Sequence, residues 1–506
     1  MAKALMIQGT MSNAGKSIVT AGLCRVLNQD GYKVAPFKSQ NMALNSFITR
    51  TGAEMGRAQV VQAEAANIEP SALMNPILLK PTSDEGSQVI VNGKAIGTMK
   101  AAEYYEFKQQ LITEILKAYN SLAATNDIIV IEGAGSPAEI NLKSNDIVNM
   151  GMAKMAKAPV ILVADIDRGG VFASIYGTLM LLEEDERAMV KGILINKFRG
   201  DLEILKPGLS MIEEKTGVPV IGVLPMMQVD IEDEDSLSDR LNTPAEVKVI
   251  DIAVVRIPKM SNYTDFNVFE IIPGVSVRYI SSVAELGHPD MIIIPGTKNT
   301  IADLFWMRQN GVEAEVMKQA SNGTVVFGVC GGYQILGRNL SDPFGVEAGG
   351  DVPGMNLLPV ETIFAEKKRT IQIQGHFGEV KGIFSSLSSK PFHGYEIHSG
   401  VTNLEGGTAL NMMQPINEPG ELVPEGAQNM EGKHNVYGSY CHGIFDGDGI
   451  AITIVEALLA KKGMKMDDIK TFSFADYKKQ QYDILADYVR SAVDMKQIYT
   501  IIEEGV

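Results

Sequence analysis

The chain contains a cysteine, at the end of a short apolar run, that is placed to do chemistry. The run 325–329 predicts a buried strand, Cys330 follows it directly, and a helix is expected to open at Tyr333. A thiol at a helix N-terminus meets the helix dipole and free backbone N–H groups, which favour the thiolate. Gly331 and Gly332 allow a tight turn, and the Gly331 N–H is placed to face an oxyanion. This arrangement predicts a nucleophile, although an isolated cysteine at such a turn is more often a buried apolar side chain.

The pattern Cys-x-Gly-x-Gln from Cys330 to Gln334 resembles that of the class I glutamine amidotransferases. This resemblance favours a nucleophile over a buried apolar side chain. In that family the cysteine attacks the side-chain amide of glutamine. The resemblance implies that Gln334 contacts glutamine and that Gly331 is one oxyanion donor. It also implies that the backbone of Gly296 and Thr297, after a predicted strand at 291–294, supplies the second donor.

Acyl transfer by a cysteine also needs a base, because it proceeds through a thiolate–histidine pair. His442 follows a strand-like run and precedes a glycine, as the family histidine does. The usual His-x-Glu partner is missing, since Ile444 stands in its place, and this departure recurs in the branch that amidates cobalamin precursors. The sequence therefore leaves the residue that orients His442 unassigned. Farther up the chain, Glu396 and His398 alternate onto one face of a strand-like segment, where they either face the same cleft or form a structural pair.

A second motif, 9–17, connects a predicted strand at 4–9 to an apolar helix at 18–27. A strand, a glycine-rich loop and Lys-Ser at the helix start form a phosphate cradle, in which Lys16 reaches the terminal phosphates and Ser17 binds Mg²⁺. The spacing G-x5-G-K-S is one residue longer than the common one and resembles the dethiobiotin-synthetase-like branch of the P-loop proteins. We therefore predict a site for ATP and Mg²⁺. Its expected loop residues are Thr10, Asn13, Ala14, Gly15, Lys16 and Ser17.

Further polar residues are expected at this nucleotide site. Glu132 ends a predicted buried strand beside the P-loop, which suits a metal ligand or a water contact. Asp84, in a polar loop, is a second candidate for the metal. By resemblance to the same branch, Asn196 corresponds to an adenine contact, and Lys197 adjoins it.

Ligands of open α/β sheets bind at the carboxyl ends of strands. Four polar residues after a predicted strand at 32–37 are therefore expected to contact an acceptor or a phosphate; they are Lys38, Gln40, Asn41 and Asn45. A polar loop with asparagine caps is the alternative. Asp165 and Asp167 follow another strand, and Asp167 is expected to serve the acceptor or metal site, whereas Asp165 is favoured as a helix cap.

Composition limits the class of protein. A net charge of −16 argues against nucleic acid, which would favour a basic stripe. The three cysteines, Cys24, Cys330 and Cys441, are too widely spaced for a disulfide framework or a thiolate metal cluster, which suits a reducing cytosol. The sequence has no basic and apolar leader, and no apolar run approaches ~20 residues. We therefore expect a cytoplasmic protein that does not bind membranes.

Strands alternate with helices in both halves of the chain, which predicts two α/β domains. Residues 1–232 are expected to form a P-loop domain with a parallel sheet, and 249–460 a class I glutamine amidotransferase-like domain. The linker 233–248 includes much of an acidic run, expected to be a solvated loop rather than a calcium site. Residues 401–435, rich in Gly, Pro and Asn, are expected to form a long surface excursion. Residues 461–506 are expected to form a helical extension packed on the second domain.

A glutaminase releases ammonia, and a P-loop domain can phosphorylate a carboxylate so that ammonia attacks it. Together the motifs indicate an ATP-dependent amide synthetase. The chain resembles the cobyric acid synthase family of cobalamin biosynthesis in the P-loop and in six further segments, 38–43, 164–173, 196–201, 295–300, 394–398 and 440–443. This resemblance implies that glutamine and ATP are used to amidate the b, d, e and g carboxylates of a corrinoid, adenosylcobyrinic acid a,c-diamide.

Three alternatives remain beside this interpretation. The sister enzyme that makes the a,c-diamide from cobyrinic acid shares both domain types. A partition-type ATPase switch resembles the N-terminal half but would not need a glutaminase. A degenerate glutaminase serving only as a scaffold is the third, and the presence of both Cys330 and His442 argues against it.

Overall fold

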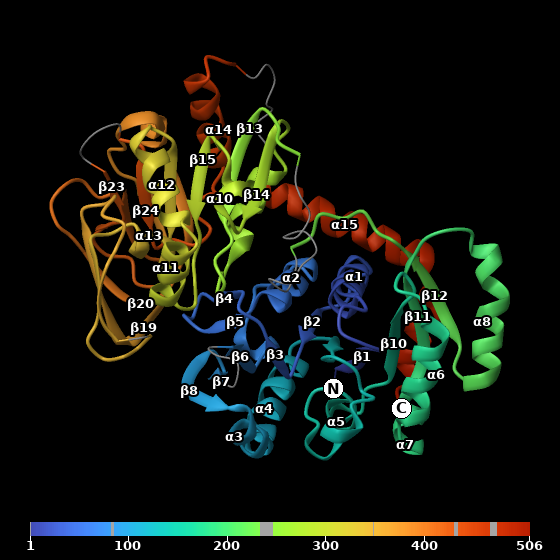
Figure 1. Cartoon of the computed structure of the whole chain (residues 1–506). Helices are drawn as coiled ribbons and strands as arrows, with labels where there is room; N and C mark the ends of the chain where they lie inside the picture. The colour runs from blue at the N-terminus through green and yellow to red at the C-terminus, as the bar shows by residue number, and fades with distance from the viewer. Residues whose placement is uncertain (1, 82–85, 233–245, 348, 430–433, 466–472) are drawn as a thin grey trace. The chain divides into compact units, whose positions relative to one another are not determined.

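The computed structural model describes residues 2–81, 86–232, 246–347, 349–429, 434–465 and 473–506 (Figure 1). The chain divides into two compact units. Unit 1 comprises Met1–Ala43, Glu54–Glu232 and Tyr477–Val506, and unit 2 comprises Leu44–Ala53 and Asp233–Asp476. Each unit contains a mainly or wholly parallel sheet with helices, so the predicted α/β class is confirmed for both.

Unit 1 is built on a six-stranded sheet in which every neighbouring pair is parallel. In sheet order the strands are β12 (Val220–Pro225), β11 (Val190–Phe198), β10 (Val160–Asp165), β1 (Lys3–Gly9), β9 (Ile128–Glu132) and β2 (Val34–Phe37). The central strands are apolar runs buried on both faces, as parallel sheets require. The carboxyl ends of β1, β9 and β10 therefore meet at one edge of the sheet, where the P-loop begins.

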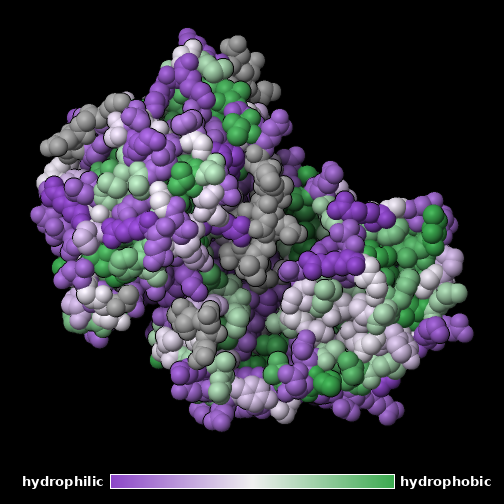
Figure 2. All heavy atoms as spheres, viewed as in Figure 1, coloured by the Kyte–Doolittle hydropathy of each residue, from purple (hydrophilic) through white to green (hydrophobic). Residues whose placement is uncertain are grey.

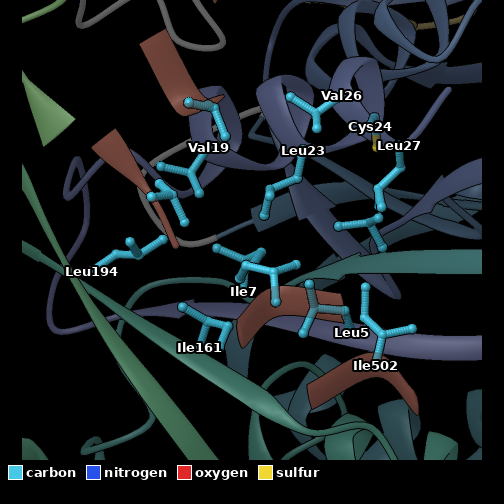
Figure 3. Packing of buried hydrophobic residues seen from close by; sticks show 14 of the residues in the cluster. Leu5, Ile7, Val19, Leu23, Cys24, Val26, Leu27, Ile161, Leu194 and Ile502 are labelled. Carbon is cyan, nitrogen blue, oxygen red and sulfur yellow. The ribbon is translucent and has the colours of Figure 1, made fainter. Parts of the chain in front are cut away.

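Helices connect the strands of unit 1, and several of them contact this sheet. They are α1 (Lys16–Gln29), α2 (Arg57–Ala65), α3 (Ala101–Phe107), α4 (Ile112–Ala123), α5 (Met150–Ala156), α6 (Val171–Leu181), α7 (Glu184–Met189) and α8 (Leu202–Thr216). Figure 3 shows Leu5 and Ile7 of β1 packed with Leu23 of α1 in one apolar cluster. A smaller sheet in the same unit joins β3 (Gln40–Met42), β6 (Ile77–Pro81), β7 (Gly86–Val91) and β8 (Lys94–Lys100).

From Tyr477 onward the C-terminal helices belong to unit 1, which corrects the expectation for most of 461–506. The part of this range up to Asp476 belongs to unit 2. The helices α15 (Phe474–Ala492) and α16 (Met495–Glu504) bury Val489 and Ile502 in the same cluster as Leu5 of β1. An added Cβ at Gly22 of α1 would lie 2.7 Å from Val489 Cγ2, so α15 approaches α1 closely. The amphipathic pattern predicts that these helices pack on other elements but does not identify those elements. In the structure α15 packs on α1, and α16 contacts β1.

Unit 2 contains a second, mainly parallel sheet. In order its strands are β14 (Val275–Ile280), β13 (Ile250–Val255), β15 (Met291–Ile294), β16 (Val325–Val329), β24 (Val436–Ser439) and the antiparallel β23 (Ala427–Gln428). Its helices are α9 (Asn267–Glu270), α10 (Val283–Leu286), α11 (Thr300–Gln309), α12 (Val312–Ser321), α13 (Gly331–Ile335) and α14 (Ile450–Lys461). The adjacent parallel strands β15, β16 and β24 bring their carboxyl ends together, and the residues after these ends include Cys330 and His442.

A further sheet of unit 2 includes part of 401–435, so the stretch predicted as a surface excursion contains short paired strands between exposed turns. Its strands are β17 (Asn339–Asp342), β18 (Gly350–Pro353), β19 (Val360–Phe377), β20 (Pro391–Leu404), β21 (Asn411–Pro415) and β22 (Val423–Glu425). The last residues of β20 lie in this stretch, as do all of β21, β22 and β23. Glycine and proline signals mark turns, and here the turns separate short strands that pair with β19 and with one another.

Polar and apolar side chains are mixed over the visible surface (Figure 2). Hydrophobic side chains gather around α8, where Ile204 and Met211 are exposed. Among the described residues, no helix combines the length and the apolar character that crossing a membrane requires.

Candidate active sites

The first site is the turn between β16 and α13, where Cys330 adopts φ +52° and ψ −109°. This left-handed conformation is strained for a residue with a side chain, and such strain is characteristic of functional turns. The Cys330 N–H donates to the Ser439 carbonyl at 2.8 Å, which ties the turn to β24. An added Cβ at Gly331 would lie 3.1 Å from the Thr297 backbone nitrogen, and one at Gly332 would lie 1.9 Å from the Ile294 carbonyl oxygen. Glycine is therefore required at both positions, and the backbones of Gly331 and Thr297 lie close together.

His442 is held by a carboxylate from a distant part of the chain. Its Nδ1 lies 2.7 Å from Asp265 Oδ2, and the other carboxylate oxygen accepts the Gly443 N–H at 3.0 Å. Asp265 lies in the 3₁₀ turn Tyr263–Phe266, and both Asp265 and His442 are buried. With one ring nitrogen engaged by Asp265, the other nitrogen is left to serve the thiol. Asp265 thus fills the position that sequence analysis left unassigned.

The surroundings of His442 favour the imidazolium. Burial lowers the pKa of His442, but the Asp265 carboxylate and Cys330, through charge and hydrogen bonding, raise it to about 10. In thiolate–histidine pairs the charged imidazole accompanies the nucleophilic form of the cysteine. Complete burial raises the pKa of the neighbouring Cys441 thiol well above its usual value, so this thiol stays protonated.

The strand β20 contacts both Cys330 and His442. The Tyr395 ring stacks on His442 with centroids 5.3 Å apart and an interplanar angle of 23°, and Cys330 Sγ lies 3.6 Å from the Ile397 carbonyl oxygen. Glu396 pairs with Arg369 and lies 3.7 Å from His398 Nε2, and the ring of His398 stacks on Tyr440. The structure thus favours a structural role for Glu396 and His398, while the backbone between them contacts the thiol.

The second site is the P-loop of unit 1. Asn13 and Gly15 have positive φ values of 60° and 97°, and α1 begins at Lys16. Lys16 Nζ donates to the carbonyl of Gly135, which lies just after β9, at 3.0 Å. Asn196 Nδ2 donates to the Ala14 carbonyl at 3.0 Å, and this close approach leaves no room for a side chain at Gly15. The loop is thus contacted by β11 and by the residues that follow β9.

Glu132 is the buried centre of this second site. Its Oε1 accepts Ser17 Oγ at 2.8 Å and Lys38 Nζ at 2.9 Å, and its Oε2 accepts Gln62 Nε2 at 2.5 Å. A carboxylate beside the P-loop serine is the donor pair that Mg²⁺ prefers. Thr10 Oγ1 is buried and has no hydrogen-bond partner in the part of the chain that the structure describes, as expected for a group that faces a ligand. The residues present therefore fit a nucleotide with its metal ion.

Comparison with known proteins agrees with both sites. Residues 251–450 match the model of the CobB/CobQ-like glutamine amidotransferase domain, and residues 5–237 match that of the CobQ/CobB/MinD/ParA nucleotide binding domain. The chain is 58% identical over its whole length to a cobyric acid synthase of Ruminiclostridium cellulolyticum and covers 98% of that protein. It is 57% identical to one of Lachnoclostridium phytofermentans, with complete coverage of both chains. The chain belongs to the cobyric acid synthase family. It is therefore a ligase-type enzyme with a glutamine amidotransferase domain and a nucleotide-binding domain.

In this member of the cobyric acid synthase family, other residues predicted for the amidotransferase site lie near Cys330 and His442. An added Cβ at Gly296 would be 3.0 Å from His442 Cε1, so Gly296 lies against the imidazole. The amide of Gln334 is held by the Thr300 hydroxyl at 2.9 Å and by the Tyr440 hydroxyl at 3.0 Å. Its predicted contact with glutamine stays a prediction.

The residues predicted for the nucleotide and acceptor sites are distributed more widely. Lys197 Nζ donates to the Asn13 carbonyl at 2.7 Å and pairs with Asp165 at 2.9 Å. Of the remaining nucleotide and metal candidates, Asp84 lies outside the described residues. Among the residues that are described, no group of three or more His, Cys, Asp or Glu side chains is arranged to hold a metal ion.

The five acceptor candidates separate into different places. Lys38 contacts Glu132 directly, and Asn41 reaches it through Gln59, whose Oε1 accepts Asn41 Nδ2 at 3.0 Å. Three candidates lie apart from this pair: Gln40 contacts Tyr104, Asp167 pairs with Arg199, and Asn45 lies in unit 2. Sequence reasoning missed Gln59 and Gln62, since glutamines on a helix after the acceptor loop carry no motif.

Proposed function

We propose that this protein amidates the b, d, e and g carboxylates of adenosylcobyrinic acid a,c-diamide, using glutamine as nitrogen donor and ATP as activator. The observation that carries the proposal is the buried Asp265–His442 pair beside the strained Cys330 turn. The same chain has a P-loop whose Ser17 contacts the buried Glu132. The corrinoid substrate rests on the name of the relatives that match over their full length.

The proposed glutaminase reaction uses unit 2. The Cys330 thiolate attacks the side-chain carbonyl of glutamine, and the electron pair of the carbonyl moves to oxygen. The backbone N–H groups of Gly331 and Thr297 stabilise this oxyanion. His442 gives its proton to the leaving nitrogen, so ammonia departs and a thioester forms. His442 then takes a proton from water, which attacks the thioester and releases glutamate.

The proposed synthetase reaction uses unit 1. A substrate carboxylate attacks the terminal phosphoryl group of ATP, so a carboxyl phosphate forms and ADP leaves. Ammonia then attacks the carbonyl carbon, and phosphate departs with the former carboxylate oxygen. Lys16 and the loop amides would stabilise the transferring phosphoryl group. Ser17 and Glu132 would hold Mg²⁺, which neutralises charge on the phosphates when bound.

The test compares nitrogen donors in the wild type and in Cys330→Ala. We expect Cys330→Ala to lose glutamine-driven amidation of the a,c-diamide corrinoid and to keep amidation driven by ammonium with ATP turnover. The matched control is Cys441→Ala, which removes a buried thiol of raised pKa and is expected to retain most glutamine-driven activity. Loss of both activities in Cys441→Ala but not in Cys330→Ala would contradict the assignment. Amidation of cobyrinic acid in place of the a,c-diamide would assign the sister reaction.

A further inference from the structure

A ten-residue segment of the N-terminal half of the chain belongs to the amidotransferase unit. Leu44–Ala53 is assigned to unit 2, although the residues on both sides of it, up to Ala43 and from Glu54, belong to unit 1. It also lies outside residues 251–450, which match the amidotransferase domain model. The segment therefore supplies unit 2 with side chains that the domain itself lacks.

Two buried asparagines join this segment to unit 2. Asn45 Oδ1 accepts the backbone N–H of Asn262 at 2.8 Å, and Asn262 Nδ2 donates to the Ser46 carbonyl at 2.9 Å. Asn262 also donates to the Tyr395 hydroxyl at 2.6 Å, and that hydroxyl donates to the Ser46 carbonyl at 3.2 Å. Asn45 and Asn262 are 1% and 2% exposed, so these hydrogen bonds are shielded from water. Asn262 has φ +55°, a left-handed conformation that such contacts hold in place.

Two residues of this hydrogen-bond network, Asn262 and Tyr395, connect it to His442. Asn262 begins the turn that carries Asp265, and its carbonyl accepts the Asp265 N–H at 3.2 Å. Tyr395 stacks on the His442 ring, and the two backbones exchange hydrogen bonds of 3.1 and 2.9 Å. The imidazole is thus fixed at Nδ1 by Asp265 and on its face by Tyr395. Asn45 and Ser46 hydrogen-bond to Asn262, which begins the turn of Asp265, and Ser46 also accepts the Tyr395 hydroxyl.

We propose that Asn45 is a positioning residue of the glutaminase, which acts on His442 through Asn262 and Tyr395. The proposal rests on the glutaminase reaction proposed above. A shift of the imidazole by a fraction of its hydrogen-bond length would misalign proton transfer to the leaving nitrogen, and small misplacements of this kind are costly in rate. Asn45 was predicted as an acceptor contact, and its burial in unit 2 gives it this different role.

The experiment uses the full chain with Asn45→Ala and Asn45→Asp. Alanine removes the acceptor for the Asn262 N–H, whereas aspartate keeps an oxygen at that place. The control is Thr51→Ala, at an exposed position of the same segment. Tyr395→Phe, which loses the hydroxyl and keeps the ring, provides a second test should Asn45→Ala fail to fold. The readouts are kcat and KM for glutamine, the alkaline limb of the pH profile, and ATP turnover with ammonium.

We expect Asn45→Ala to lower kcat for glutamine about tenfold or more with little change in KM. We also expect its alkaline limb to move to lower pH, because His442 then pairs less well with Asp265 and Cys330, the charged groups that face it. Asn45→Asp should recover most of the rate, Tyr395→Phe should change it in the same direction as Asn45→Ala, and Thr51→Ala should match the wild type. Wild-type kcat and pH profile in Asn45→Ala and Tyr395→Phe would overturn the proposal. A wild type that lacks glutaminase altogether would instead overturn the proposed function.

Discussion

Asp265 and Cys330, which lie far from His442 in the sequence, raise the pKa of its imidazole. A carboxylate 2.7 Å from Nδ1 fixes the orientation of the ring and favours its charged form. The raised pKa of His442 means that the imidazolium persists across the neutral range. At this scale the site is an ion pair that burial opposes and that charge and hydrogen bonding to Asp265 and Cys330 maintain.

Replacing Asp265 tests this directly. In Asp265→Asn the pKa of His442 should fall, since the carboxylate that raises it is gone, so the alkaline limb of glutaminase activity should move to lower pH. We expect the rate near pH 8 to drop by about tenfold or more. The check is a pH profile of glutamate release for both proteins. An unchanged alkaline limb would show that Asp265 does not set the protonation of His442.

Replacing Glu132 tests the second site. Glu132→Gln removes the charge that pairs with buried Lys38 and the carboxylate beside Ser17. We expect ammonium-driven amidation to fall about 100-fold or more, while glutaminase activity at Cys330 persists. The matched control is Glu139→Gln, at an exposed position of the same unit. Wild-type amidation in Glu132→Gln would rule out a role for this carboxylate in phosphoryl transfer.

At the scale of elements, sequence reasoning succeeded where a function is encoded by adjacent residues. The P-loop and the Cys330 turn were located because a strand, glycines and a helix start follow one another directly. Asp265 was missed because its partner is 177 residues away and the polar loop around it carries no motif. Likewise, Asn45 follows a predicted strand of the nucleotide-binding half, and only the folded chain shows its hydrogen bond to Asn262.

The C-terminal helix α15 gives a prediction at the same scale. Leu485 is fully buried against Ala21 and Val61 of unit 1, so Leu485→Ala should reduce the free energy of unfolding of that unit by about 2–5 kcal/mol. Hydrogen exchange should become faster in peptides of α1 and β1 and stay unchanged in peptides of β16 and β24. Lys479→Ala, at an exposed position of the same helix, is the control. Faster exchange confined to unit 2 would contradict this placement of α15.

At the scale of the whole molecule, the chain passes between the two units more than once. It leaves unit 1 for Leu44–Ala53 and again for Asp233–Asp476, and it returns to unit 1 from Tyr477 onward. Neither unit is therefore a single continuous segment, and a fragment limited to residues 251–450 would lack Asn45.

The measurement that tests the central claim most directly follows nitrogen from glutamine into the corrinoid. The full-length wild type is incubated with ATP, glutamine labelled with ¹⁵N in its side-chain amide, and adenosylcobyrinic acid a,c-diamide. Mass spectrometry should show a product with four ¹⁵N amides, and each amide should be accompanied by one ADP and one glutamate. Release of ADP and glutamate without ¹⁵N in the corrinoid would contradict the account.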